Sequence, residues 1–188
     1  EEFARYLRSK GVVVSIAHTA ATPDDVDRAA EAGFSHATHF YNAMTQQHKE
    51  GMYSKAGTVE GVYDHSEMTV EVIGDGIHVP VRTIRLAYGM KGVENMAFIT
   101  DALAVAASDS TKAFDERVRI ENGVCVLSDG SAIAGSIATM DRVIKVAVTE
   151  AGIPLEDVAR MVAETPARIM GVYDRKGSIE RGKDADII

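Results

Sequence analysis

The sequence is short of several features that would each indicate a particular class of protein. Its single cysteine, Cys125, allows no internal disulfide, so a reducing compartment is the simplest interpretation and we predict a cytoplasmic protein. No apolar run is long enough to span a bilayer, and no basic cluster accompanies the formal net charge of −8. We therefore expect neither a membrane nor a nucleic acid as a partner.

Buried strands are predicted in four places, and each runs into a side chain that can bind a metal or carry a proton. The strands are predicted over 12–17, 35–40, 69–74 and 96–100, and the side chains are His18, His39, His78 and Asp101. Helical patterns follow over 22–32, 58–63, 81–90, 139–150 and 155–164. This alternation predicts the α/β class with a mainly parallel sheet, and we expect a partial (β/α)8 barrel of the TIM type. A doubly wound open sheet is the alternative, but no glycine-rich phosphate loop follows the first strand.

The second half of the sequence departs from this rhythm. Strands over 117–120 and 124–127 flank Asn122-Gly123, a dipeptide that favours an antiparallel hairpin. The segment 133–135 is expected to return to the barrel, Pro166 to begin a short helix, and 177–188 to form a loop and a strand. Earlier in the chain, 42–57 is predicted to be a long loop, a type of segment that often carries function.

Histidine and aspartate at these strand ends predict a metal site. Neutral imidazole is the commonest protein ligand of zinc-like metals, and neighbouring strand ends lie about 4.8 Å apart. His18 and His39 are therefore predicted to bind one divalent metal, with zinc as first choice and iron or another divalent ion as alternatives. Asp101 can accept a proton from a metal-activated water, and His78 can orient or polarise a substrate carbonyl. The structural alternatives are a helix cap for Asp101 and a backbone-bonded loop residue for His78.

The other histidines are assigned lesser roles. His36 and His39 are three residues apart, so on a strand they point to opposite faces, and His36 is predicted to be structural. His48 and His65 lie in polar stretches and are predicted to be exposed loop residues.

A series of short motifs gives the chain a family resemblance. They are Ala17-His-Thr19, Ala37-Thr-His-Phe-Tyr-Asn-Ala-Met44, Asp75-Gly-Ile-His-Val79, Ile99-Thr-Asp-Ala102, Ala134-Gly-Ser136 with Thr139-Met140, Pro166-Ala-Arg168 and the segment 177–186. In these motifs and their order the chain resembles the N-acetylglucosamine-6-phosphate deacetylases, a family of the amidohydrolase superfamily. The resemblance implies metal-dependent hydrolysis of the acetamide of N-acetylglucosamine 6-phosphate to glucosamine 6-phosphate and acetate, in amino-sugar catabolism. It also implies a homodimer.

The resemblance also implies roles for individual residues. His18 and His39 match the family's two histidine metal ligands, and Asp101 matches the acid that activates water and then protonates the leaving amine. His78 matches a substrate contact near the scissile carbonyl.

Further substrate contacts are implied at Asp75 in the same motif, at Asn42 and the backbone of Ala43 for the phosphate, and at Ile133, Ala134 and Gly135. An ordinary turn remains the alternative interpretation of Asp75-Gly76.

Two departures from the family pattern are expected. The family's third protein ligand, a glutamate, and most of its small β-sandwich domain would precede this chain. The chain lacks an initial methionine and has 188 residues, fewer than the roughly 250 of a complete barrel. We predict a C-terminal fragment, with part of the barrel over 1–175, a hairpin excursion near 114–130, and the return to the β-sandwich domain over 176–188.

The family's phosphate-binding arginine, expected after Asn-Ala-Met, has no counterpart. Lys49 is its candidate replacement and His48 the second choice, although lysine lacks the bidentate fork of arginine.

Two rival functions stay open. The first is another amidohydrolase, such as a cyclic-amide or acyl-amino-acid hydrolase, which would not need a phosphate site at Asn42 and Ala43. The second is a catalytically incomplete barrel fragment with a structural or assembly role, which metal analysis and turnover would identify.

Overall fold

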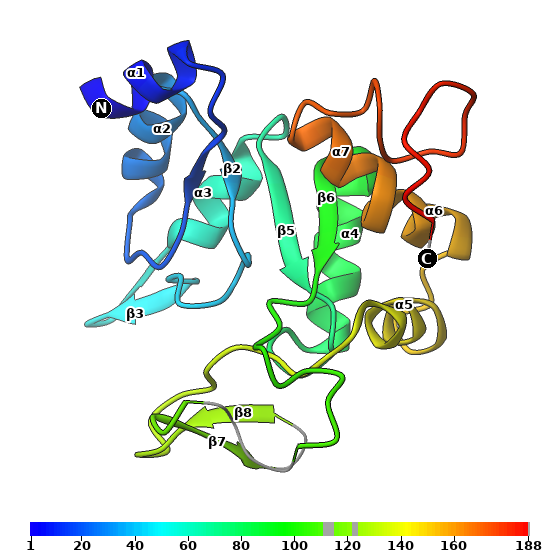
Figure 1. Ribbon diagram of the computed structural model, residues 1–188. Helices are drawn as coiled ribbons and strands as arrows, with labels where there is room; N and C mark the ends of the chain where they lie inside the picture. Colours follow the sequence, from blue (N-terminus) through cyan, green and yellow to red (C-terminus); the bar gives the residue numbers. More distant parts are fainter. Residues whose placement is uncertain (111–114, 122–123, 188) are drawn as a thin grey trace.

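A parallel four-stranded sheet lies at the centre of the molecule (Figure 1), in a computed structural model that describes residues 1–110, 115–121 and 124–187. The strand order is β1–β2–β5–β6, and every neighbouring pair is parallel. The strands are β1 (Val14–Ile16), β2 (Phe34–Ala37), β5 (Thr69–Ile73) and β6 (Met96–Ile99). The prediction of an α/β fold with a parallel sheet is confirmed, although β1 and β2 are shorter than the sequence suggested.

Helices alternate with these strands as predicted. They are α1 (Glu2–Ser9), α2 (Pro23–Ala32), α3 (Thr58–Asp64) and α4 (Val81–Asn95), and Figure 1 shows α4 passing behind β5 and β6. The start of α2 is a capping box, in which the Thr22 hydroxyl accepts a hydrogen bond from the Asp25 N–H and the Asp25 carboxylate accepts one from the Thr22 N–H. The helix predicted over 81–90 is found, and its regular backbone is interrupted by a kink at Gly92, with φ 69°, before α4 reaches Asn95.

The two faces of the sheet differ in chemistry, because alternate residues of a strand point to opposite sides. One face contributes Ile16, Ala37, Val70, Val72, Met96 and Phe98 to the main hydrophobic core. The pairing register places Ser15, His36 and Thr69 in one row on the other face, with Glu71 further along β5. His36 forms hydrogen bonds with Thr69 and Glu71, whereas the Ser15 hydroxyl bonds to that of Thr38, so the side chains of this face make polar contacts.

A small antiparallel hairpin interrupts the segment 42–57, which was predicted to be a loop throughout. It consists of β3 (His48–Glu50) and β4 (Tyr53–Lys55), connected through Gly51 with φ 60°. All six strand residues are exposed, so no buried apolar alternation marked the hairpin in the sequence.

A second antiparallel hairpin follows β6, as predicted, and lies below the sheet in Figure 1. It is formed by β7 (Val118–Glu121) and β8 (Val124–Leu127), while the predicted turn residues 122–123 lie outside the described residues. Ile133 still pairs with Val126 of β8, and contact with the end of the sheet begins at Ser136, which bridges to Ala102. The return to the sheet therefore comes slightly later than predicted, because the first residues of 133–135 extend the hairpin.

The last third of the chain is helical and then irregular. It contains α5 (Met140–Thr149), α6 (Leu155–Ala159), the π-helical turn η1 (Arg160–Glu164) and α7 (Thr165–Ile169). The predicted separate helices over 155–169 form one continuous run, in which the Thr165 N–H donates to the Arg160 carbonyl.

The strand predicted within 177–188 is not found over 177–187, because no described strand pairs with this segment. Among the described helices, none combines the length and apolar character that crossing a membrane requires.

Candidate active site

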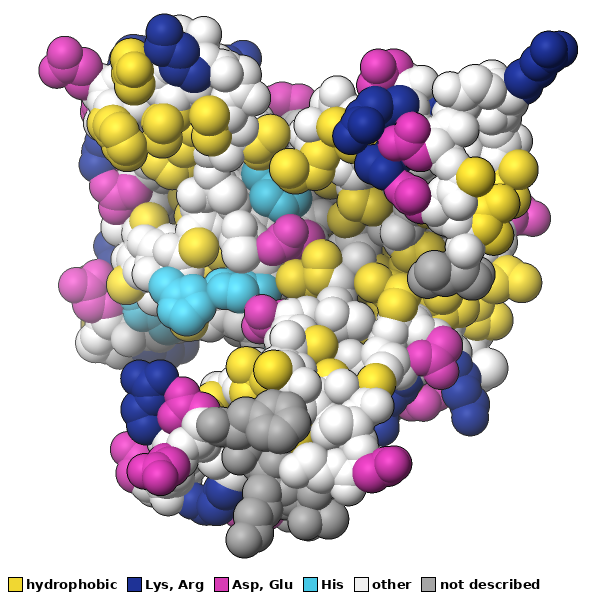
Figure 2. All heavy atoms as spheres, in the orientation of Figure 1, with side chains coloured by type: hydrophobic (Ala, Val, Ile, Leu, Met, Phe, Trp, Pro, Cys, Tyr) yellow, Lys and Arg dark blue, Asp and Glu magenta, His cyan; other side chains and the backbone are white. Residues whose placement is uncertain are grey.

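Four polar segments follow the carboxyl ends of the four sheet strands. His18 follows β1, His39 follows β2, Asp75 and His78 follow β5, and Asp101 follows β6. Because the strands are parallel, all of these residues lie at one edge of the sheet. Figure 2 shows histidine side chains with acidic ones beside them, at the margin of a notch between the sheet and the hairpin β7–β8.

The two predicted metal ligands face one another. The Nε2 atoms of His18 and His39 are 2.9 Å apart and the ring centroids 4.6 Å. Both residues have left-handed backbone, with φ 43° and 32°, and so does Asp101, with φ 48°. Such conformations cost a non-glycine residue about 1–3 kcal/mol each and cluster at functional sites. The backbone is therefore strained at three of the four positions that the sequence singled out.

This pair fits part of a metal site. Two nitrogen ligands about 2.0–2.1 Å from one tetrahedral zinc lie about 3.3 Å apart, close to the observed separation of the Nε2 atoms. An open zinc site usually has three protein ligands. Within the described ranges, however, no group of three or more histidine, cysteine, aspartate or glutamate side chains could hold a metal ion. This pair would thus supply two of the ligands that a zinc ion requires.

His78 is held by Asp75, its neighbour in the same turn. The Asp75 carboxylate accepts hydrogen bonds from His78 Nδ1 at 2.7 Å and from the N–H groups of Ile77 and His78 at 2.8 and 3.0 Å. Burial raises the pKa of Asp75, but these hydrogen bonds outweigh burial and hold the pKa below its usual range. Both oxygens of Asp75 are engaged within the turn, so its geometry fits orientation of His78 better than the substrate contact predicted for it.

Two buried ring nitrogens, Nε2 of His78 and Nδ1 of His39, find no hydrogen-bond partner among the described residues. Buried polar atoms of this kind usually have a partner, so an unpaired one calls for an explanation such as a bound ligand or ion. Asp75 forms a hydrogen bond with Nδ1 of His78, so Nε2 is the ring nitrogen that remains available to a ligand.

Asp101 is exposed, and its backbone carbonyl accepts a hydrogen bond from the Ser136 N–H at 2.9 Å. This contact places the predicted substrate loop of Ile133, Ala134 and Gly135 beside Asp101. A Cβ at Gly135 would lie only 3.3 Å from the Asp101 carbonyl oxygen. In the part of the chain described, no hydrogen bond joins the Asp101 carboxylate to His18 or His39. The three residues lie at the same edge of the sheet without a hydrogen bond between the acid and the imidazoles.

The predicted phosphate contacts lie in a tight turn after β2. The Asn42 side-chain amide and backbone N–H both donate to the His39 carbonyl, at 3.1 and 2.9 Å. Tyr41 and Ala43 have left-handed backbone, with φ 80° and 50°. Turns with alternating backbone handedness point N–H groups inward and can bind anions.

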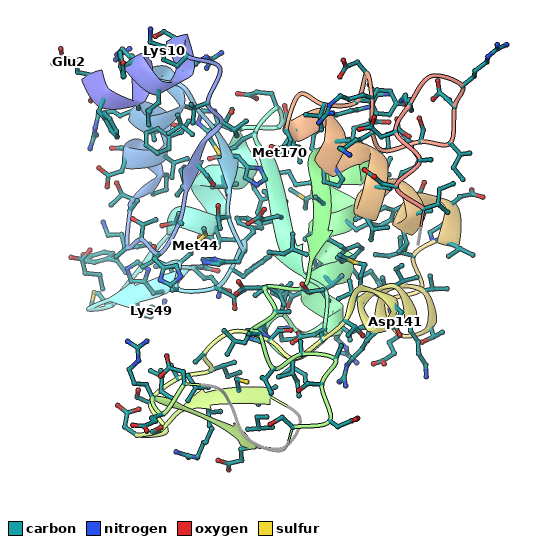
Figure 3. All side chains as sticks on the ribbon, viewed as in Figure 1. Glu2, Lys10, Met44, Lys49, Asp141 and Met170 are labelled. Carbon is teal, nitrogen blue, oxygen red and sulfur yellow. The ribbon has the colours of Figure 1, made fainter. Side chains whose placement is uncertain are left out.

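Lys49 lies on the exposed hairpin strand β3, where its amine donates to the Ser54 hydroxyl at 2.8 Å (Figure 3). The second choice, His48, is also exposed, and its Nδ1 pairs with the Gln46 carbonyl at 3.0 Å.

Sequence reasoning missed Glu71, in the middle of β5. Its carboxylate lies 3.3 Å from His36 Nε2 and accepts the His39 backbone N–H at 3.3 Å. Burial raises the pKa of Glu71, but its hydrogen bonds with the His36 ring and the His39 N–H outweigh burial and hold the pKa below its usual range. The sequence signal for Glu71 was a single acidic residue within the otherwise apolar run 70–73.

The structure also shows the surroundings of two other histidines, His36 and His65. His36 is buried, as its predicted structural role requires. The expectation of an exposed His65 is wrong, since its side chain is 21% exposed and bonded to Asp27 at 2.8 Å, a contact that raises the pKa of the imidazole.

Comparisons with known proteins give a consistent result. A family model described as the amidohydrolase family matches residues 3–188. The chain is 33% identical over 189 residues to the N-acetylglucosamine-6-phosphate deacetylase of Bacillus subtilis, covering 100% of this chain and 46% of that protein. It is 31% identical over 189 residues to an N-acetylgalactosamine-6-phosphate deacetylase of Shewanella, covering 98% of this chain and 46% of that protein.

Among solved structures, the N-acetylglucosamine-6-phosphate deacetylase from Pasteurella multocida superposes with a TM-score of 0.88 and 37% identity. The match covers 98% of this chain and 48% of that one. The chain therefore spans about half the length of the relatives it matches.

Proposed function

Because the chain belongs to the amidohydrolase family, we propose that it is part of a metal-dependent deacetylase of an amino-sugar phosphate. The substrate is N-acetylglucosamine 6-phosphate, and the products are glucosamine 6-phosphate and acetate. The observation that carries this proposal is the pair of facing imidazoles, His18 and His39, at adjacent strand ends in a chain whose relatives bear that name.

The architecture proposed for the whole protein is a (β/α)8 barrel. Its support is a parallel sheet with helices packed on one face and polar side chains on the other, in a chain about half as long as its relatives. Residues 1–175 would form part of the barrel and 176–188 the return to a smaller domain.

The chemistry requires a nucleophilic water, a polarised carbonyl and a proton for the leaving amine. A divalent metal, zinc as first choice, would be held by His18 and His39 with a further ligand outside the described residues. When bound, it supplies Lewis acidity and lowers the pKa of water. The exposed carboxylate of Asp101 accepts the proton of the water and returns it to the amine nitrogen. His78, held at Nδ1 by Asp75, presents its free Nε2 to the carbonyl oxygen and, when doubly protonated, donates a hydrogen bond there.

Recognition of the sugar phosphate is assigned to the turn after β2 and to the loop beside Asp101. The amide of Asn42 and the backbone of Ala43 contact the phosphate, with Lys49 as the candidate cation. The segment 133–135 contacts the sugar. Local N–H donors are needed in this role, since the chain as a whole carries a formal charge of −8.

Replacing Asp101 by Asn in the full-length protein that carries this chain tests the mechanism. The amide cannot accept the proton, so we expect acetate release to fall by about 10²–10⁴-fold while bound metal, measured by atomic emission, stays unchanged. Asp109→Asn, at another exposed acid after β6, is the matched control and should leave the rate unaltered. Activity that survives Asp101→Asn rules out the role given to this carboxylate.

A second candidate substrate is N-acetylgalactosamine 6-phosphate, because one relative at 31% identity carries that name. Rates with the two 6-phosphates and with unphosphorylated N-acetylglucosamine separate the candidates. Equal rates with and without phosphate would favour another amidohydrolase activity, such as that of a cyclic-amide or acyl-amino-acid hydrolase. Metal analysis and turnover of the 188-residue chain alone test whether it is catalytically incomplete.

A further inference from the structure

The polar face of the sheet contains a connected set of side chains to which no catalytic role has been given. His36, Thr69 and Glu71 lie on this face, on β2 and β5. His36, on β2, precedes His39 by three residues, and Glu71 of β5 contacts the turn that carries His39. The set therefore connects the polar face of the sheet with the candidate site.

Glu71 contacts the His39 turn through two different groups. Its backbone carbonyl accepts a hydrogen bond from the Phe40 N–H at 2.7 Å, and its carboxylate Oε1 accepts one from the His39 N–H at 3.3 Å. On the other side of the turn, the Thr38 N–H donates to the Ile16 carbonyl of β1 at 2.9 Å. His39, with φ 32°, is thus held between two neighbouring strands.

The side chain of Glu71 is itself held in place. Its second oxygen lies 3.3 Å from Nε2 of His36, whose Nδ1 lies 2.8 Å from the Thr69 hydroxyl. The His36 side chain is only 8% exposed and that of Glu71 24% exposed. Because His36 is enclosed and bonded at both ring nitrogens, it fixes the carboxylate in the orientation that meets the His39 N–H.

We propose that Glu71, oriented by His36, is a positioning residue for His39. The carboxylate stabilises the left-handed turn from which Nε2 of His39 faces Nε2 of His18. A positive φ is unfavourable for histidine, and a hydrogen bond to the N–H of that residue offsets part of the strain. The consequence for metal affinity rests on the proposed function, whereas the consequence for the conformation of the turn does not.

Three variants of the full-length protein, labelled at histidine with ¹⁵N and ¹³C, test this inference by NMR. Glu71→Ala removes the acceptor, Glu71→Gln keeps a carbonyl oxygen that can accept the same N–H, and Glu67→Ala removes an exposed carboxylate just before β5. We expect amide exchange at His39 to become roughly tenfold faster in Glu71→Ala, with loss of the Overhauser contact between the His18 and His39 rings. Glu71→Gln and Glu67→Ala should retain the parent values.

Zinc affinity provides an independent readout of the same variants. Loss of a residue that orients a metal ligand typically weakens affinity by about 10–100-fold, and we expect that loss in Glu71→Ala but less than about threefold in Glu71→Gln. If the parent binds no zinc, the metal part of the proposed function fails, and the two NMR measurements still decide the role of Glu71.

Two results would overturn the inference. One is an unchanged His39 amide and ring contact in Glu71→Ala. The other is equal damage in Glu71→Gln and Glu71→Ala, which would assign the effect to negative charge rather than to the hydrogen bond. If Glu71→Ala does not fold, Glu71→Met fills the volume without an acceptor and is judged by the same two criteria.

Discussion

Positive φ angles occur at three residues of the candidate site that follow sheet strands. His18, His39 and Asp101 each adopt a positive φ. Each of them follows the end of its strand after one intervening residue. Because only glycine adopts such angles without strain, the surrounding contacts must enforce them. The hydrogen bonds to Glu71 and Ser136 are two such contacts.

Gly74, directly after β5, allows the sheet to pack closely against α5. A Cβ at this position would lie 2.5 Å from Val143 Cγ1 and 2.8 Å from Phe98 Cδ1. We expect Gly74→Ala to lower the free energy of unfolding by about 1–3 kcal/mol through overpacking, measured by urea denaturation.

The matched control is Gly89→Ala in α4, where a Cβ meets nothing within 4 Å. This substitution should stabilise the protein by up to about 1 kcal/mol, because alanine is the better helix former. A neutral or stabilising Gly74→Ala would contradict the packing described.

The residues proposed for the site could be selected one by one because their chemistry is carried by residue type and by position after a strand. His18, His39, His78 and Asp101 were selected in this way, and the structure places them at one edge of the sheet, while their roles stay predictions. Glu71 was not, since a single acid within a strand reveals neither its face nor its partner. The backbone strain was also invisible, because positive φ at histidine and aspartate arises from tertiary contacts rather than from local preference.

At the scale of secondary-structure elements, a buried lysine connects two helices. Lys91 of α4 donates from Nζ to the carbonyls of Val62 and His65 at 2.7 and 2.6 Å, satisfying carbonyl groups at the end of α3. Burial lowers the pKa of Lys91 to about 8. In the unfolded chain the amine keeps its ordinary pKa, so between these two values the unfolded state binds more protons than the folded state.

Stability should therefore rise with pH over the range from about 8 to 10.5. The rise due to Lys91 is at most about 1.4 kcal/mol per pH unit. Urea unfolding at a series of pH values should show this slope in the parent and its loss in Lys91→Met. Lys145→Met, at an exposed lysine of α5, should retain the slope. An unchanged slope in Lys91→Met would mean that Lys91 keeps its proton throughout this range.

Elements were predictable where local signals and burial agreed. The capping box and Pro23 marked the start of α2, and Gly33, with φ 103°, marked its end. The hairpin β3–β4 was missed because all its residues face solvent, so burial imposed no alternation on the sequence. The strand expected near the C-terminus requires a partner strand, and apolar pattern alone cannot supply one.

At the scale of the whole molecule, the hairpin β7–β8 stands apart from the main core. Val124 and Cys125 are buried, yet they do not belong to the core cluster that joins the sheet to its helices. With a small apolar contact of its own, the hairpin should open without unfolding of the sheet.

Hydrogen exchange followed by mass spectrometry measures this difference. We expect amides of 118–121 and 124–127 to exchange at least about 100-fold faster than those of β5 and β6, after correction for intrinsic rates. Equal protection in the two regions would place the hairpin in the same cooperative unit as the sheet.

The π-helical turn η1 has a consequence for chain length. Its Arg160–Thr165 hydrogen bond spans one residue more than an α-helical turn would, while the Thr165 hydroxyl still reaches the Val93 carbonyl of α4. Deleting a residue from an ordinary helix rotates everything beyond it by about 100°. A deletion of one residue between 160 and 164 could instead convert the π-helical turn into an α-helical turn. A shorter homologue could therefore lose a residue here and keep the orientation of α7.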